Sequence, residues 1–89
     1  MKNIGKDFKE LVNDTYIQDI AQGHLESWSD RYNNYKTKKE VEFDLNVNHD
    51  PSLEIERAEE DLKRELTTEE NDKLISLFNK KVVKLFRKS

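Results

Sequence analysis

Residues 41–47 read VEFDLNV, and the fold expected for the whole chain depends on how this stretch is interpreted. Its apolar side chains occupy every second position, namely Val41, Phe43, Leu45 and Val47. Strict alternation of β-branched and aromatic side chains with polar ones favours a half-buried β-strand. We therefore predict a strand over residues 41–47. Because a single strand cannot satisfy its own backbone hydrogen bonds, it needs a neighbouring strand.

The stretch that follows allows two interpretations. In the first, residues 48–51 turn the chain and residues 52–56 return as the second strand of a hairpin. In the second, Asp50 caps a helix that begins at Pro51, because proline is well suited to the first helical position. Both interpretations agree on a helix farther along, where the apolar residues are Ile55, Ala58, Leu62 and Leu66. The sequence alone leaves residues 52–56 open between strand and helix.

The polar residues of the same region raise the question of a calcium site. Oxygen-bearing side chains fall at every second position, which are Asp44, Asn46, Asn48 and Asp50. The first three match the spacing of the first ligands of an EF-hand loop. However, His49 stands where that loop needs a glycine, and Ile55 stands where it needs a bidentate glutamate. We therefore predict no calcium site and interpret these residues as the solvent-facing side of the strand.

Two helices are predicted before the strand. Apolar residues recur at helical spacing over residues 4–12 and again over residues 17–35. The two apolar faces differ by roughly 140° when one helix is drawn through both, so a single straight helix cannot bury them together. We expect a break near residues 13–15, where Thr15 and Gln18 fit a capping box.

The clearest helix signal lies near the end of the chain. Thr67 and Glu70 fit a capping box, and the helix that they start is expected to run to about Arg87. Its apolar side chains share one face, and they are Leu74, Ile75, Phe78, Val82, Leu85 and Phe86. Basic side chains occupy the opposite face.

Together these elements predict one small domain, residues 1–89, of the helix-rich α+β class. It would contain two N-terminal helices, a strand or hairpin, and two C-terminal helices. The side chains expected in its core are Phe8, Leu11, Ile20, Leu25, Trp28, Leu62, Leu66, Leu74, Phe78, Val82 and Phe86. A domain of 89 residues buries only a thin core and the strand needs a neighbour, so we also expect a homodimer.

The composition argues against several functions. The chain has no cysteine, which excludes disulfides and thiolate metal sites and fits a reducing compartment. No apolar run is long enough for a membrane span and the N-terminus does not resemble a signal peptide, so we expect a cytoplasmic protein without membrane contact. His24 and His49 are too few for a zinc site in one chain, and no nucleophile or phosphate-loop motif is present. We therefore predict neither a cofactor nor an enzymatic activity.

Charge is divided between two neighbouring segments. Residues 51–72 hold nine acids and three bases, whereas residues 73–89 hold six bases and no acid. The acidic segment supplies candidate partner-binding residues, which are Glu59, Glu60, Asp61, Glu65, Glu69 and Glu70. The basic segment supplies an alternative set for nucleic acid or an acidic partner, which is Lys73, Lys80, Lys84, Arg87 and Lys88. The simplest alternative is that the two segments face each other within the molecule.

For function we expect a non-enzymatic protein that binds and modulates a larger protein of unknown identity. Small, charged domains rich in Lys, Asn and Glu are common in phages and mobile elements, and an inhibitor of a host or defence enzyme is a specific form of this expectation. The alternative is a small nucleic-acid-binding regulator that uses the basic C-terminal helix. The net charge of −3 argues against that alternative, because nucleic-acid-binding domains are usually basic.

Overall fold

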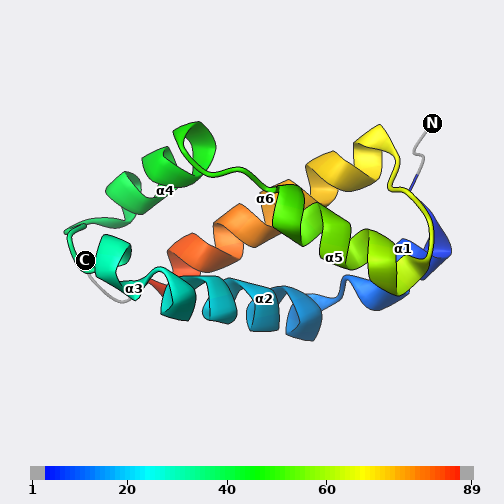
Figure 1. Ribbon diagram of the computed structural model, residues 1–89, viewed down its shortest axis with the longest axis horizontal. Helices are drawn as coiled ribbons and strands as arrows, with labels where there is room; N and C mark the ends of the chain where they lie inside the picture. Colours follow the sequence, from blue (N-terminus) through cyan, green and yellow to red (C-terminus); the bar gives the residue numbers. More distant parts are fainter. Residues whose placement is uncertain (1–3, 87–89) are drawn as a thin grey trace.

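The computed structural model describes residues 4–86, and within them the chain forms six helices and no strand (Figure 1). The helices are α1 (Lys6–Leu11), α2 (Asp14–Ser27), α3 (Ser29–Tyr32), α4 (Lys38–Val47), α5 (Ser52–Leu62) and α6 (Thr68–Leu85). The described part of the protein is therefore a helical bundle, and the predicted α+β class is wrong. Both segments proposed for a hairpin are helical.

The predicted strand at residues 41–47 is wrong because its alternation combines two separate helical faces. In α4, Val41 and Leu45 lie one turn apart and are buried, with 0% and 3% of their surface exposed. Phe43 and Val47 are also one turn apart, but they are 65% and 61% exposed. Residues four apart share a helical face. The buried pair and the exposed pair are offset by two positions, so together they place an apolar residue at every second position, as a strand would.

The start of α4 carries a signal that the alternation obscures. The Thr37 side chain accepts a hydrogen bond from the Glu40 backbone N–H at 3.3 Å, and the Glu40 carboxylate accepts one from the Thr37 N–H at 3.0 Å. This capping box satisfies two backbone donors of the first turn. On the buried face, Asp44 is only 3% exposed and accepts hydrogen bonds from Arg31 and Asn48. A charged residue on the buried face hides the helical pattern in the sequence.

The helical interpretation of residues 52–56 is confirmed. The Asp50 carboxylate accepts hydrogen bonds from the Ser52 backbone N–H at 3.0 Å and from the Ser52 hydroxyl at 2.6 Å. Asp50 therefore holds the start of α5, although the first helical residue is Ser52 and not Pro51. The need for a neighbouring strand, which was one reason to expect a homodimer, no longer exists.

The predicted break between the first two helices is confirmed. Asn13 is the N-cap of α2, and its side-chain oxygen accepts a hydrogen bond from the Tyr16 backbone N–H at 2.9 Å. The start signal is thus Asn13 and not the capping box expected at Thr15. The long helix expected over residues 17–35 is shorter, because α2 ends at Ser27 and is followed by the single turn of α3.

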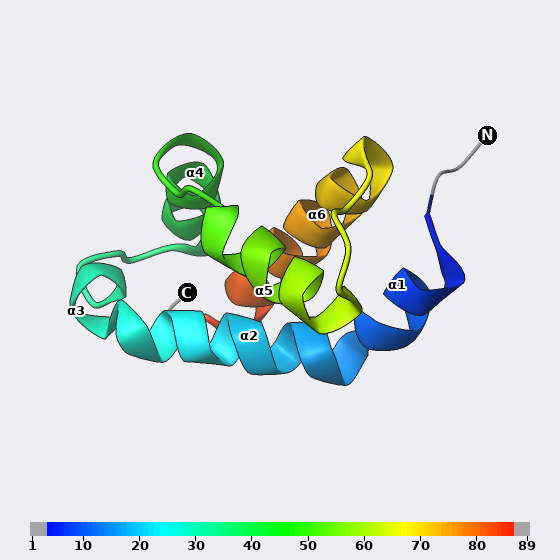
Figure 2. The same cartoon turned by 45° about the vertical axis from the view of Figure 1, so that its right-hand side comes forward.

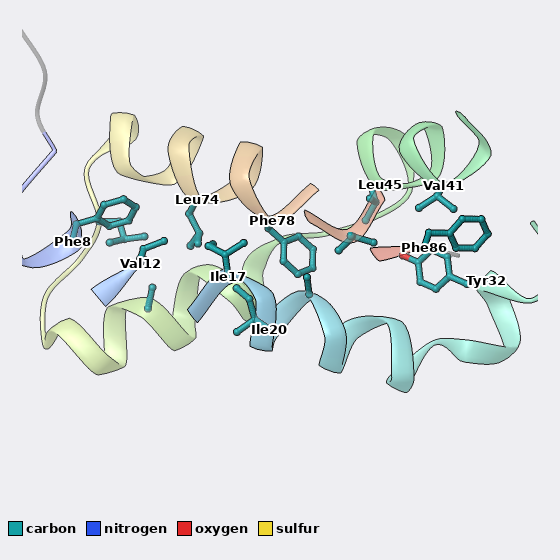
Figure 3. Close-up of a cluster of buried hydrophobic side chains, with 14 residues drawn as sticks. Phe8, Val12, Ile17, Ile20, Tyr32, Val41, Leu45, Leu74, Phe78 and Phe86 are labelled. Carbon is teal, nitrogen blue, oxygen red and sulfur yellow. The ribbon is translucent and has the colours of Figure 1, made fainter. Parts of the chain in front are cut away.

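The core is an elongated row of side chains organised by α6, which packs against α2 and α4. The buried face of α6 repeats at intervals of one helical turn, with Leu74, Phe78, Val82 and the following Phe86 all at most 6% exposed. Figure 3 shows Phe8 and Val12 beside Leu74 at one end of this row. Tyr32 and Val41 surround Phe86 at the other end. The molecule is correspondingly long, with principal extents of 38 × 23 × 19 Å.

Most of the predicted core is confirmed, with one clear exception. Trp28 is 50% exposed and lies in the single-residue link between α2 and α3, beyond the last turn of α2. Three other predicted core residues are only half-buried, and they are Leu11, Leu25 and Leu62. Trp28 is therefore available at the surface.

An ionic cluster centred on the buried Glu70 joins α1 to the connection between α5 and α6. Glu70, in the first turn of α6, has no exposed surface. Its carboxylate accepts hydrogen bonds from the Arg64 guanidinium at 2.7 and 2.8 Å, from Gly5 N–H at 2.8 Å and from Thr67 N–H at 2.9 Å. Arg64 also pairs with Asp7 of α1 at 2.8 Å. We refer to Glu70, Arg64 and Asp7 as the Glu70 cluster.

The Glu70 cluster predicts a loss of stability in acid. Hydrogen bonds from Arg64, and from the backbone N–H groups of Thr67 and Gly5, lower the pKa of Glu70 from 4.5 to about 2 and outweigh the effect of burial. Because the folded pKa lies below the unfolded one, this stabilisation is complete above pH 4.5 and is lost as the pH falls towards 2. Urea unfolding across this range should show a declining free energy of unfolding. Glu70→Gln should flatten the decline, and an unchanged slope in this variant would contradict the assignment.

Candidate protein-binding groove

The acidic residues predicted to bind a partner do not form one surface. Glu70 is buried in the cluster described above, and the Glu59 carboxylate accepts a hydrogen bond from the Leu66 backbone N–H at 2.9 Å. These two carboxylates therefore stabilise the fold around the connection between α5 and α6. Glu60, Asp61 and Glu65 are exposed, and Glu69 is half-buried in the first turn of α6.

The basic residues of the alternative set lie on α6 where the structure describes them. Lys73, Lys80 and Lys84 are exposed, and their spacing places them on one side of the helix. Arg87 and Lys88 lie outside the described residues. Lys81, on a neighbouring face, forms an ion pair with Asp14 of α2 at 2.8 Å. The described cations thus form a short stripe of three lysines, not an extended basic surface.

A groove of about 940 Å³ runs between α2 and α5, and we call it the α2–α5 groove. Figure 2 shows α5 running obliquely above α2, so that the two helices approach each other near the start of α2 and diverge towards α3. Two large apolar side chains in its wall are exposed to solvent: Trp28 at the end of α2 and Leu53 in the first turn of α5, which is 72% exposed. Exposed apolar groups gathered in a groove are typical of interaction sites.

The rest of the α2–α5 groove is acidic. It is lined by two guanidinium groups and by five carboxylates, which are Glu54, Glu56, Glu59, Glu60 and Glu65. Arg64 is already paired with carboxylates of the Glu70 cluster, while Glu59 accepts a hydrogen bond from the Leu66 backbone N–H and Glu54 contacts His49. The groove therefore combines a negative wall with apolar contact points, and it includes three of the acids predicted from the sequence to bind a partner.

A smaller cavity of about 310 Å³ continues from the same end of the groove, and we call it the histidine pocket. The two hollows share His24, Trp28, Leu53 and Glu54. In this pocket, His24 Nε2 lies 2.6 Å from the hydroxyl oxygen of Tyr32, and His49 Nε2 lies 2.9 Å from Glu54 Oε1.

Aromatic packing holds the two imidazole rings against the core. Phe78 stacks on His49 with a centroid distance of 5.5 Å and meets His24 edge-on at 5.2 Å. Burial, together with the neighbouring His49, lowers the pKa of His24 to about 4. His24 is therefore neutral near pH 7. The pocket is a polar cluster that packs against Phe78 of α6.

Sequence reasoning missed both Trp28 and the histidine pocket. His24 and Trp28 are four residues apart at helical spacing, which is a visible signal, but the sequence predicts Trp28 in the core. The sequence predicts a turn at His49 and leaves Glu54 open between a strand and a helix, so no pattern brings the two towards His24. With α5 starting at Ser52, Glu54 falls in its first turn and faces the histidine that precedes the helix.

Comparisons with known proteins add no further constraint on this site. No family model matches this chain, and neither does any curated protein or solved structure. Within residues 4–86, none of the helices is both long enough and apolar enough to cross a membrane.

Proposed function

We propose that this protein is a non-enzymatic modulator that binds a partner protein through the α2–α5 groove. The observation that carries the proposal is the exposure of Trp28 and Leu53, at 50% and 72%, within a groove lined by five carboxylates. Tryptophan is strongly enriched among the residues that dominate binding energy at interfaces. Exposure of these apolar side chains to water is unfavourable in free energy, and a bound partner that covers them would remove this unfavourable contribution.

The chemistry of the groove indicates the kind of partner segment. An amphipathic helix can place its apolar face in a hydrophobic groove, and Trp28 and Leu53 supply the apolar contacts here. The surrounding glutamates favour lysine or arginine on the rim of that segment and accelerate its association. They also repel the phosphates of nucleic acid. A basic amphipathic segment of a larger protein is therefore the ligand that fits.

Two further features of the proposal concern biological setting. An enzyme that exposes such a basic segment would be a suitable target, and the specific form of the proposal is a phage or mobile-element inhibitor of a host or defence enzyme. The absence of cysteine fits a reducing compartment, so we place the protein in the cytoplasm. Self-association is a further proposal, supported by the small size of the domain.

The alternative function is binding of nucleic acid through the lysine stripe of α6. Exposure of Lys73, Lys80 and Lys84 on one side of the helix favours it. Under this alternative, affinity for a DNA duplex or an RNA strand falls steeply as salt concentration rises. Charge reversal at Lys80 and Lys84 would abolish it, whereas the same changes would leave binding at the α2–α5 groove intact.

The test is isothermal titration calorimetry with a synthetic amphipathic helix that carries lysines on its polar face. We expect one peptide per chain, and we expect Trp28→Ala and Leu53→Ala each to weaken binding by roughly tenfold or more. Val47→Ala is the matched control, because Val47 is 61% exposed but lies outside the groove lining. Equal affinity of all four proteins, or binding of nucleic acid in place of the peptide, would reject the groove as the interface.

A further inference from the structure

His24, His49 and Glu54 form a cluster of three potential metal ligands. Each offers one ligand atom, and these atoms all lie within 4.8 Å of one another. The residues come from α2, from the connection between α4 and α5, and from the first turn of α5. All three are half-buried, and the two imidazole centroids are 4.7 Å apart.

We propose that His24, His49 and Glu54 bind one divalent transition-metal ion of the zinc class. Two imidazoles and one carboxylate are a ligand set that zinc accepts, with a fourth position left for water. Nitrogen ligands disfavour calcium and magnesium, which prefer oxygen. This proposal goes beyond the protein-binding function and does not depend on it.

The distances are compatible with coordination after small movements. Ligand atoms about 2.0–2.2 Å from a tetrahedral zinc ion lie roughly 3.3–3.6 Å from one another. The present limit of 4.8 Å, and the 2.9 Å between His49 Nε2 and Glu54 Oε1, bracket this value. Side-chain shifts of about an ångström would therefore bring the three atoms into position. The histidine pocket, about 310 Å³ in volume, gives an ion access and leaves room for water.

The surroundings support a site that orients its ligands. The hydroxyl oxygen of Tyr32 lies 2.6 Å from His24 Nε2, and Phe78 stacks on His49. A hydrogen bond at the second ring nitrogen holds a metal-binding imidazole in a fixed orientation, so the Tyr32 contact leaves Nδ1 of His24 as its metal ligand. A bound ion would replace the contact between His49 and Glu54 and would tie α2 to the start of α5. Binding should therefore stabilise the fold.

The experiment titrates the full chain, freed of metal by chelation, with Zn²⁺ in a calorimeter and with Co²⁺ in a spectrophotometer. We expect one ion per chain, visible absorption typical of tetrahedral Co²⁺, and a rise in melting temperature with Zn²⁺ concentration. Glu54→Gln and His49→Ala should each weaken binding by more than roughly 100-fold, the upper end of what loss of an outer contact costs. Glu56→Gln, which alters an exposed acid of the same helix, is the matched control.

Several results would overturn the proposal. If the wild-type protein binds neither Zn²⁺ nor Co²⁺, the proposed metal site does not exist. Unchanged affinity in Glu54→Gln would place the ion elsewhere, and one ion for two chains would show a site made by association. If circular dichroism shows that His49→Ala does not fold, the nearly isosteric Glu54→Gln variant decides alone, because it keeps the size and a hydrogen-bonding group of the original side chain.

Discussion

Glu70→Ala should lower the free energy of unfolding by about 2–4 kcal/mol, because it removes the acceptor of a buried set of hydrogen bonds. The side chain has no exposed surface and accepts from Arg64, Gly5 and Thr67. After the substitution, two backbone N–H groups lose their partner and the first turn of α6 loses half of its capping box. The connection from α5 to α6 and the contact with α1 would weaken together.

Urea denaturation followed by circular dichroism measures this effect, with the midpoint expected to fall and the slope to stay constant. Asp72→Ala is the matched control, since Asp72 is an exposed acid early in the same helix. Its effect should stay within about 0.5 kcal/mol. If the two variants were equally stable, the carboxylate of Glu70 would not have the structural role that its contacts indicate.

Leu45→Ala should lower the free energy of unfolding by about 2–4 kcal/mol, the usual cost of emptying a buried leucine site. Phe43→Ala, two residues earlier, should change it by no more than about 0.5 kcal/mol. The contrast follows from α4, in which Leu45 is 3% exposed and packs against the core while Phe43 is 65% exposed. In a strand, the two side chains would share one face and would cost similar amounts.

The same denaturation assay compares the two variants directly. Leu45→Met serves as the conservative control, because a swap that preserves volume should cost less than about 1.5 kcal/mol. A large loss in Phe43→Ala, comparable to that in Leu45→Ala, would contradict the helical assignment of residues 38–47.

The sequence predicts helices correctly where periodicity and a capping signal agree. Thr67 and Glu70 mark the start of α6, and the apolar stripe that follows is the observed core face. The break near Asn13 is also correct, because the two apolar faces are out of phase. The strand prediction for residues 41–47 is wrong because Asp44 lies on the buried face of the helix. It pairs there with Arg31, thirteen positions away, and no local pattern in the sequence reveals this pair.

The site was predictable only in part, for the same reason. The acids Glu59, Glu60 and Glu65 were identified as candidate partner-binding residues and do line the α2–α5 groove. Trp28 was assigned to the core, because periodicity identifies an apolar face but does not show where the helix ends. The histidine pocket requires residues from three segments, and their meeting depends on the helical start of α5 that the sequence left open.

The single row of side chains along α6 has a consequence for how the molecule unfolds. Phe8 and Val12 rest on one end of that helix, and Tyr32 and Val41 rest on the other. Neither end has an apolar centre of its own, so neither is expected to melt while the other persists. The bundle should behave as one cooperative unit, with the slowest-exchanging backbone amides in the middle of α6.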